Sequence, residues 1–392
     1  MLKILACHNY YLIRGGEDQC FEDEVQLLRA NGHEVSTLTE NSGSITNGLA
    51  VATRLPWSRE SYRKVTEAIL KDKPDIVHFT NTFPLITLSG PAAAHDAGVP
   101  VVASMHNYRA MCASAYFLRN GKVCEKCLGS AGSMPAVLHK CYRDSHISSL
   151  AMAGTIAWQR GTNQWGRYID LFCTPSRYAS AKLIQGGFPR DRVVVKQNFV
   201  ANSPLPGTGK GGFALFAGRL SPEKGLNVLL GAWRADSSLP PLLIVGEGPL
   251  ADQATIASSG DSRIKYLGKL PLAKLLELMG EAICLLMPSI WYETFGRTMI
   301  EAYSKGTPVI ASNMGCMAEL VKDGTTGFLF EPGSSQSLAE AIHRLMKQPK
   351  LMSTFRSQCR QAFESDYTSE QNYQLLTQLY KAAIEIQKTS RK

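Results

Sequence analysis

Short apolar runs alternate along the chain with amphipathic stretches of helical period. The first pair is an apolar run at residues 3–7 followed by a helical pattern at 17–30. Runs of nearly continuous Val, Ile and Leu are typical of strands that are buried on both faces of a parallel sheet. The first half of the chain is therefore expected to form a doubly wound α/β domain, with strands at residues 3–7, 33–38, 75–79, 99–104, 170–174 and 192–197.

Residues 201–212 interrupt this alternation, because they contain few apolar side chains and several glycines and prolines. We interpret them as a linker between an N-terminal domain at residues 1–200 and a second doubly wound domain at 213–365. The length of 392 residues agrees with two domains, since a single hydrophobic core rarely grows that large. Strands of the second domain are expected at residues 213–217, 242–245, 264–267, 283–287 and 308–311.

A helix at residues 370–387, within the segment 366–392, is the last predicted element. Its apolar positions recur at helical spacing and form a stripe that needs a surface to cover it: Tyr373, Leu376, Leu379, Tyr380, Ala383 and Ile384. We expect this helix to cross back to the N-terminal domain. The two Rossmann-like sheets are expected to face a central cleft, because open α/β sheets bind ligands beyond the carboxyl ends of their strands.

Composition narrows the class of protein. Hydrophobic residues make up 44% of the chain and charged residues 19%, which favours folded α/β domains over long disordered segments. No apolar run approaches the roughly 18 residues of a membrane span, and the apolar stretch at the N-terminus is too short for the core of a signal peptide. We therefore expect a cytoplasmic protein, and any membrane contact is expected to be peripheral, on the inner face.

The positive charge is concentrated in one part of the chain. The formal net charge is +9, and residues 101–200 contain 13 Lys and Arg against 4 Asp and Glu, which equals the whole excess. A local basic surface is predicted there. Nucleic acid, an anionic lipid leaflet and phosphorylated small molecules all attract such a surface by the same Coulomb interaction, so charge alone does not choose among them.

Four of the ten cysteines cluster inside this basic stretch. Cys112, Cys124, Cys127 and Cys141 have the spacing C-x11-C-x2-C-x13-C within an insertion at about residues 108–146. The close Cys124 and Cys127 pair has the spacing of zinc ligands, and a structural zinc ion would hold an insertion that has few core residues. Unligated thiols and a redox-dependent disulfide are the alternatives. The insertion also carries several aromatic residues, and we expect it to face an acceptor that bears phosphate or lies at a membrane.

Candidate chemistry lies in the loops that follow predicted strands. Gly15 and Gly16 come after the first strand and before a helix, where backbone amides can approach an anion. A tight turn without a ligand explains these two glycines equally well. Arg219 and Lys224 follow the first strand of the second domain, where two cations can clamp a diphosphate. Solvated surface cations are the alternative interpretation.

The segment at residues 291–302 is the most informative of these loops. Glu293 lies in the loop after the predicted strand at 283–287, and Glu301 lies within the helix that follows. Carboxylates accept hydrogen bonds from hydroxyl groups, and the amides of Phe295 and Gly296 at the helix start can bind phosphate. A sugar nucleotide offers hydroxyls on both sides of a diphosphate, which suits this order of groups. Ordinary acidic residues near a helix start are the alternative.

The sequence resembles the GT-B-fold retaining glycosyltransferases of family 4, glycosyl transferases group 1. The resemblance extends over nearly the whole chain, and its motifs together are highly specific: Gly15-Gly16, Gly32-His33-Glu34-Val35, Pro74-Asp75-Ile76-Val77-His78, Gly218-Arg219-Leu220, Lys224-Gly225, Gly246-Glu247-Gly248-Pro249, Glu293-x7-Glu301 and Gly306-Thr307-Pro308-Val309. A looser match places Glu319 after Gly315.

Residue roles follow from the resemblance. It implies that Arg219 and Lys224 bind the donor diphosphate, that Glu301 binds the ribose, and that Glu293, Phe295 and Gly296 bind the sugar and phosphates. It also implies a histidine beside the transferred sugar, which is His106 here. A retaining transfer from a nucleotide diphosphate sugar to a glycan or lipid-linked acceptor is the implied reaction. Because no Asp-x-Asp triplet occurs, we expect no catalytic metal or cofactor, with Arg219 and Lys224 in the metal's place.

Other functions explain less of the sequence. A dinucleotide oxidoreductase is expected to carry G-x-G-x-x-G after the first strand, and that motif is missing there. A zinc-containing nucleic-acid-binding protein accounts for the basic stretch and the cysteines but leaves the motifs of the second domain unexplained. A nucleotide-sugar hydrolase or a sugar phosphorylase on the same fold remains the nearer alternative, and a product assay with and without acceptor distinguishes it.

Overall fold

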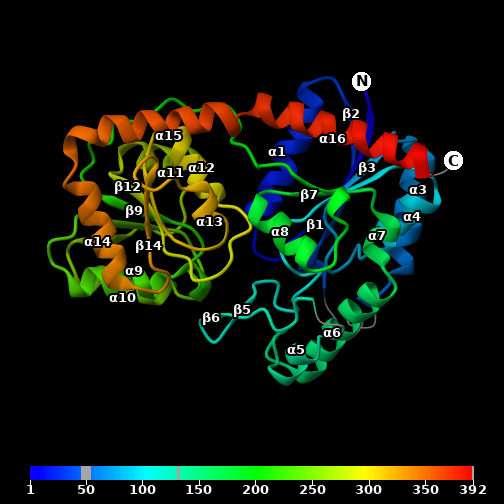
Figure 1. Ribbon diagram of the computed structural model, residues 1–392, viewed down its shortest axis with the longest axis horizontal. Coiled ribbons are helices and arrows are strands. Elements are labelled where there is room, and N and C mark those ends of the chain that lie inside the picture. The colour runs from blue at the N-terminus through cyan, green and yellow to red at the C-terminus, as the bar shows by residue number, and fades with distance from the viewer. Residues whose placement is uncertain (46–53, 130–132, 391–392) are drawn as a thin grey trace. The chain divides into compact units, whose positions relative to one another are not determined.

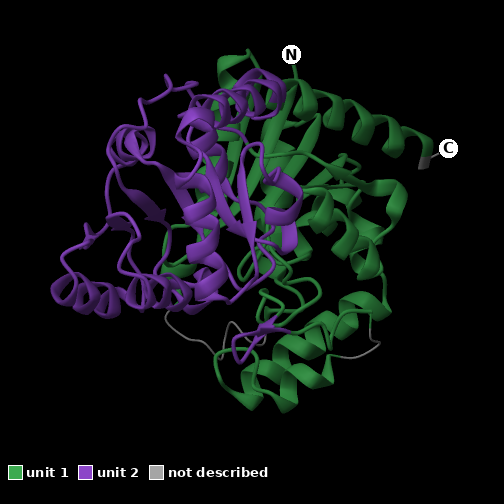
Figure 2. Ribbon diagram, turned by 60° about the vertical axis from the view of Figure 1, so that its left-hand side comes forward, with its two compact units in different colours: residues 1–117, 124–198, 372–392 green, residues 118–123, 199–371 purple. Residues whose placement is uncertain are grey.

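The computed structural model describes residues 1–45, 54–129 and 133–390. The chain divides into two compact units (Figure 2). Unit 1 consists of Met1–Phe117, Cys124–Asn198 and Asn372–Lys392, and unit 2 consists of Leu118–Val123 and Phe199–Gln371. The expected linker at 201–212 therefore lies within unit 2, and the segment after Asn372 returns to unit 1.

Unit 1 contains a six-stranded parallel sheet with the order β2-β1-β3-β4-β7-β8 (Figure 1). Its strands are short and mostly buried, as nearly continuous apolar runs predict. They are β1 (Lys3–Tyr10), β2 (Glu34–Asn41), β3 (Ile76–Asn81), β4 (Val101–Ser104), β7 (Leu171–Thr174) and β8 (Val193–Val195). A separate two-stranded antiparallel hairpin, β5 (Leu118–Arg119) and β6 (Lys122–Val123), belongs to unit 2.

Helices connect these strands. They are α1 (Gly16–Ala30), α3 (Arg59–Asp72), α4 (Ser89–Asp96), α5 (Met134–Leu138), α6 (His146–Gly161), α7 (Gln164–Tyr168), α8 (Arg177–Gln185) and the C-terminal α16 (Ser369–Ser390). Serine side chains cap three of them: Ser58, Ser145 and Ser176 each accept a hydrogen bond from a backbone N–H of the first turn. The stripe of α16 lies in the core of unit 1, where Leu376, Tyr380 and Ala383 pack with residues of α1 and the sheet.

Unit 2 repeats the same architecture. Its parallel sheet has the order β11-β10-β9-β12-β13-β14, with β9 (Ala214–Ala217), β10 (Leu242–Val245), β11 (Ile264–Tyr266), β12 (Cys284–Met287), β13 (Val309–Ser312) and β14 (Gly327–Phe330). The helices are α9 (Leu226–Ala235), α10 (Ala251–Gly260), α11 (Leu272–Glu281), α12 (Arg297–Ser304), α13 (Gly315–Leu320), α14 (Ser335–Met346) and α15 (Met352–Asp366). Short 3-10 turns, η1 (Ser42–Ser44), η2 (Arg190–Arg192), η3 (Pro222–Lys224) and η4 (Pro349–Leu351), complete the two units.

Two glycines of unit 2 allow its loops to pack closely. Gly225 has φ +76, and a Cβ there would lie 1.7 Å from the carbonyl oxygen of Pro288. Gly246 has φ +141, and a Cβ there would lie 1.8 Å from the carbonyl oxygen of Gly218. Only glycine fits both positions, because any side chain would collide with backbone atoms. The loops after β9, β10 and β12 are therefore held against one another.

Candidate functional site

Both sheets have a topological switch point where ligands of open α/β sheets bind. In unit 2 the chain passes from β9 outward through β10 and β11, and then returns to the other side of β9 with β12. In unit 1 the same reversal separates β1 from β3. The sequence motifs follow these strands, so the fold brings together loops that are distant along the chain.

The loop after β9 and the loop after β12 meet in unit 2 through an ion pair. Lys224 Nζ donates a hydrogen bond of 2.6 Å to Glu293 Oε1. The same carboxylate oxygen accepts a hydrogen bond of 2.7 Å from the Ser289 hydroxyl, and Glu293 is buried. Lys224 Nζ also lies 5.6 Å from the centre of the Trp291 ring. Two predicted donor residues, Lys224 and Glu293, are thus in direct contact.

Arg219 has a carboxylate partner that the sequence motifs did not indicate. Its guanidinium donates a hydrogen bond of 2.9 Å to Glu223 Oε1, which also accepts one of 2.7 Å from the Ser221 hydroxyl. The side chain of Glu223 is largely buried, whereas that of Arg219 is 41% exposed. A phosphate group can replace the carboxylate of Glu223 or Glu293, or bind beside it, because carboxylates and phosphates both suit a guanidinium or an ammonium group. The position of Glu223 on η3, between Arg219 and Lys224, is the only signal that could have found it.

The start of α12 contains the remaining predicted donor residues. Glu301 is buried and accepts a hydrogen bond of 3.0 Å from Arg297 Nε, one helical turn earlier. Phe295 is buried against Tyr367, with ring centres 6.1 Å apart. Gly296 is the N-cap of α12, and a Cβ there would lie 2.6 Å from Met317 Cε.

The looser motif at Gly315 adjoins the same loop. A Cβ on Gly315 would lie 3.2 Å from Tyr292 Cα. The carboxylates of Glu293 and Glu319 both add to the effect of burial in raising the pKa of the Cys316 thiol. The segment from Gly315 to Glu319 therefore lies close to Glu293.

In unit 1, His106 follows β4 and lines a pocket at the carboxyl end of the sheet. Burial lowers its pKa to about 4, so the imidazole is neutral at pH 7. His78, on the adjacent strand β3, also has its pKa lowered to about 4 by burial, and it bonds Tyr380 of α16 and Ser104 of β4, each at 2.9 Å. A neutral histidine can donate a hydrogen bond to a sugar hydroxyl or accept one from it.

A buried carboxylate beside the Gly15-Gly16 loop was missed from the sequence. Glu17 Oε2 accepts hydrogen bonds from the Tyr11 hydroxyl at 2.5 Å and from Asn107 Nδ2 at 3.3 Å. Glu17 Oε1 is a buried atom with no hydrogen-bond partner in the described residues. Burial is the main cause that raises the pKa of Glu17 to about 7. Its place directly after two motif glycines, and the place of Asn107 directly after His106, were the available signals.

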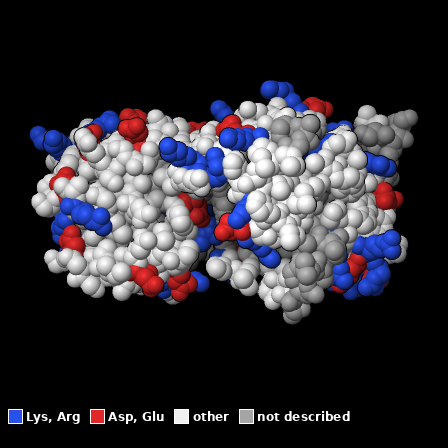
Figure 3. Space-filling model, turned by 90° about the horizontal axis from the view of Figure 1, so that it is seen from below, with Lys and Arg blue, Asp and Glu red and all other residues white. Residues whose placement is uncertain are grey.

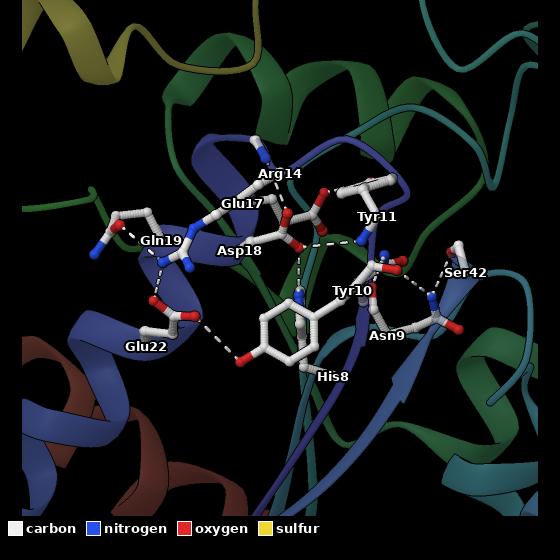
Figure 4. A network of polar contacts seen from close by, with 12 residues as sticks. His8, Asn9, Tyr10, Tyr11, Arg14, Glu17, Asp18, Gln19, Glu22 and Ser42 are labelled. Carbon is white, nitrogen blue, oxygen red and sulfur yellow. Dashed lines mark hydrogen bonds and ion pairs between the residues drawn. The ribbon is translucent and has the colours of Figure 1, made fainter. Parts of the chain in front are cut away.

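The neighbours of Glu17 fix the loop after β1 (Figure 4). Asp18 Oδ1 lies 2.8 Å from His8 Nε2, and Asp18 Oδ2 accepts a hydrogen bond of 2.9 Å from the Gly15 N–H. Asp18 and His8 are both buried. The Gly15 amide, predicted to contact the donor phosphate, already binds Asp18. Phosphate binding by Gly15 and Gly16 therefore stays a prediction.

The pocket beside His106 combines an apolar wall with a few polar groups. Phe79, Met152 and Ile156 contribute apolar side chains, and Asn107, Arg109 and Gln159 contribute polar ones. The guanidinium carbon of Arg109 lies 4.1 Å from the centre of the Phe83 ring. In the part of the chain that the structure describes, the buried Nε of Arg109 and the buried Nε1 of Trp165 have no hydrogen-bond partner. Such a lining is typical of a binding site, where few polar groups orient a largely apolar ligand.

The four cysteines of the insertion influence one another electrostatically. Burial is the main cause that raises the pKa of the Cys127 thiol to about 11. The nearby thiols of Cys112, Cys141 and Cys124 raise it further. Within the described ranges, however, no group of three or more His, Cys, Asp or Glu side chains is arranged to hold a metal ion. The side-chain arrangement does not support the predicted zinc site, which stays a prediction that metal analysis of the purified protein tests.

Two family descriptions match adjoining parts of the chain. Residues 203–362 match Glycosyl transferases group 1, and residues 14–202 match Glycosyltransferase Family 4. The phosphatidyl-myo-inositol mannosyltransferase of Mycobacterium leprae is 34% identical over 141 residues, which are 35% of this chain and 38% of the relative. The glycogen synthase of Mycobacterium tuberculosis is 31% identical over 192 residues, 47% of this chain and 45% of the relative. The chain thus matches less than half of the length of these curated relatives.

Solved structures share the fold over nearly the whole chain. Anabaena Alr3699/HepE in complex with UDP is 20% identical with a TM-score of 0.68, covering 96% of this chain and 99% of the other. Sucrose-phosphate synthase from Thermosynechococcus elongatus is 17% identical with a TM-score of 0.71, covering 97% and 98%. The two Rossmann-like units with parallel sheets therefore form the GT-B fold.

Proposed function

Since the chain belongs to the family 4 type of group 1 glycosyltransferases, we propose that it transfers a sugar from a nucleotide diphosphate sugar to an acceptor hydroxyl. The observation that carries this proposal is the contact of Lys224 with Glu293 at the switch point of unit 2. It places an ammonium group and a buried carboxylate at the start of the segment that leads to α12. A diphosphate and its sugar hydroxyls are the ligands that this pair suits.

In this proposal, two cations next to the donor diphosphate stabilise the transition state of the transfer. Negative charge develops on the nucleoside diphosphate as the sugar departs, and Lys224 and Arg219 stabilise that charge. Glu301 then binds the ribose, and Glu293 with the N-terminus of α12 binds the sugar and phosphates. We propose that the anomeric configuration is retained, that the leaving phosphate assists removal of the acceptor proton, and that no metal takes part. UDP-sugars and GDP-sugars are the donors of first choice.

Unit 1 supplies the acceptor side in this proposal. His106 bonds the transferred sugar as a neutral imidazole, and the pocket beside it holds the acceptor. The apolar wall of the pocket and the Arg109 guanidinium together suit an acceptor that joins an apolar part to a phosphate, as in a lipid-linked glycan precursor. Assembly of a cell-surface glycan is the expected setting.

Calorimetric titration tests the donor site. UDP, GDP and ADP are titrated into the protein in metal-free buffer, and one of them is expected to bind selectively. Arg219→Ala and Glu301→Ala are expected to weaken that binding at least tenfold, while Arg234→Ala, an exposed cation on α9, serves as the control. Binding of no nucleotide, or equal binding to all variants, contradicts the proposal. Release of free sugar at the same rate with and without acceptor assigns a hydrolase instead.

A further inference from the structure

An unusual helical surface projects from unit 1 beside the pocket. Helices α5 and α6 lie at the lower end of unit 1 in Figure 1, and the view from below shows a broad area over them in which uncharged side chains dominate (Figure 3). Five large apolar side chains of these two helices are exposed: Ile147 at 75%, Leu138 at 67%, Met134 and Leu150 at 56% and Trp158 at 39%. We call this set the α5–α6 apolar face.

The apolar face follows the period of α6. Exposed positions of this helix include Ile147, Leu150, Gly154 and Trp158, which lie three or four residues apart and so form one ridge. A helix face that meets water normally carries charged side chains, but His146 is the only ionisable residue among the exposed positions of α6 in the described structure. Contiguous apolar surface of this kind marks a site of contact with a protein or a membrane.

Cationic side chains border the apolar face. Lys140 and Arg143 are exposed in the turn between α5 and α6. Asp144 is the exposed acidic residue of the same turn. An apolar ridge with tryptophan and a cationic border is the pattern of helices that lie in the interface of anionic membranes, with the apolar side chains among the acyl chains. No helix within the described ranges has the length and hydrophobicity to traverse a bilayer.

The opposite side of α6 lines the pocket beside His106. Met152, Thr155, Ile156 and Gln159 point to that side and contribute to the pocket wall. A single helix, roughly 10 Å across, therefore separates the exposed ridge from the pocket. A lipid surface in contact with the ridge would lie about one helix diameter from the pocket.

We propose that the α5–α6 apolar face docks the protein on the surface of an anionic membrane. Docking stands on the exposed side chains alone, and only its link to the acceptor pocket rests on the proposed function. The apolar ridge supplies the hydrophobic contact, and Lys140 and Arg143 supply attraction to the anionic head groups.

Co-sedimentation of the full-length protein with vesicles tests docking. Vesicles of phosphatidylcholine are compared with vesicles that also contain phosphatidylglycerol. The wild type is expected to bind the anionic vesicles, and the double variant Ile147→Ser and Leu150→Ser is expected to lose at least tenfold in partitioning. Lys140→Glu with Arg143→Glu is expected to lose about tenfold, and high salt is expected to have the same effect on the wild type.

Controls separate docking from folding and from catalysis. Leu70→Ser and Ile256→Ser remove exposed apolar side chains on α3 and α10, and both variants are expected to sediment like the wild type. Nucleotide binding by calorimetry is expected to be unchanged in every one of these variants, so a failed donor site and a failed docking surface are distinguishable. Quenching of tryptophan fluorescence by brominated lipid is expected to fall in Trp158→Phe.

Three results overturn the proposal. The wild type stays in the supernatant with anionic vesicles, or the double variant of the ridge binds them as tightly as the wild type does. The third result is a stable dimer in light scattering without lipid that the ridge variant abolishes, since the face is then covered by a second copy of the chain.

Discussion

Lys224 Nζ donates a hydrogen bond of 2.6 Å to Glu293 Oε1, across two loops that follow the adjacent parallel strands β9 and β12. Glu293 is buried, and its carboxylate is also bound by the Ser289 hydroxyl. The carboxylate therefore holds the ammonium group in place before any ligand arrives. Groups positioned in this way stabilise a developing charge without a cost of reorganisation during the reaction.

Lys224→Ala is expected to lower kcat/KM for sugar transfer by about 30- to 1000-fold, which corresponds to about 2 to 4 kcal/mol. The loss follows because one of the two cations that face the leaving diphosphate disappears. Steady-state kinetics with the donor identified by calorimetry provide the measurement. Lys265→Ala, an exposed lysine on β11, is the matched control and should leave the rate unchanged. A Lys224→Ala enzyme within a few-fold of wild type rules out this role.

Glu223→Gln tests whether the partner of Arg219 positions it. Glu223 Oε1 accepts from both the Arg219 guanidinium at 2.9 Å and the Ser221 hydroxyl at 2.7 Å. We expect Arg219→Ala to lower kcat strongly, while Glu223→Gln chiefly raises the KM for the donor, by about tenfold, because the guanidinium remains but is held less firmly. Equal losses of kcat in the two variants contradict a positioning role for Glu223.

Much of the fold could be predicted from the pattern of apolar runs, because parallel strands buried on both faces have a strong signal. The strand at residues 242–245 was predicted with the bounds that the structure gives. The equally short β14, Gly327–Phe330, was missed because it begins with a glycine and lies between Gly324 and the Pro332-Gly333 pair, which are typical of turns. Helix α16 was predicted at 370–387 from its apolar stripe and extends over Ser369–Ser390.

The site was less predictable, because its partners are distant in sequence. Lys224 and Glu293 were each identified by a motif, yet their contact depends on the pairing of β9 with β12. The position of Glu17 after two motif glycines was only a weak signal, since its hydrogen bonds come from Tyr11 and from Asn107, which is distant in sequence. The exposure of Ile147 and Leu150 was also hidden, because an apolar helical period normally indicates a buried face.

Arg109→Ala is expected to raise the KM for an anionic acceptor about tenfold or more and to leave donor binding unchanged. The Arg109 guanidinium lines the pocket beside His106, and its buried Nε has no hydrogen-bond partner among the described residues. A phosphate or carboxylate of the acceptor supplies that partner. Arg109→Lys keeps the charge but loses the planar fork, so we expect a partial loss. Transfer assays at varied acceptor concentration measure the effect, and an unchanged acceptor KM in Arg109→Ala contradicts it.

Glu17→Gln is expected to make the folded protein more stable at pH 8 than the wild type. Burial raises the pKa of Glu17 from 4.5 to about 7, so the folded state holds its proton more tightly than the unfolded state does. The contribution of this group to the free energy of unfolding is therefore full below about pH 4.5 and is lost as the pH rises through 7. Because the Glu17 residue as a whole is only half-buried, although its Oε1 atom is buried, the effect is reduced by solvent screening. We therefore expect a gain on the order of 2 kcal/mol in the variant at pH 8 and little difference at pH 4.5.

The comparison between variant and wild type is essential, because other buried groups act in the opposite direction. The pKa values of His78 and His106 are lowered to about 4, so their contribution to stability is lost as the pH falls. Urea unfolding across this pH range measures the difference for Glu17→Gln and for Glu34→Gln, an exposed carboxylate on β2. The difference in the free energy of unfolding between Glu17→Gln and wild type should grow from pH 4.5 to pH 8. If it does not, Glu17 is already ionised in the folded protein at low pH, and its pKa is not raised.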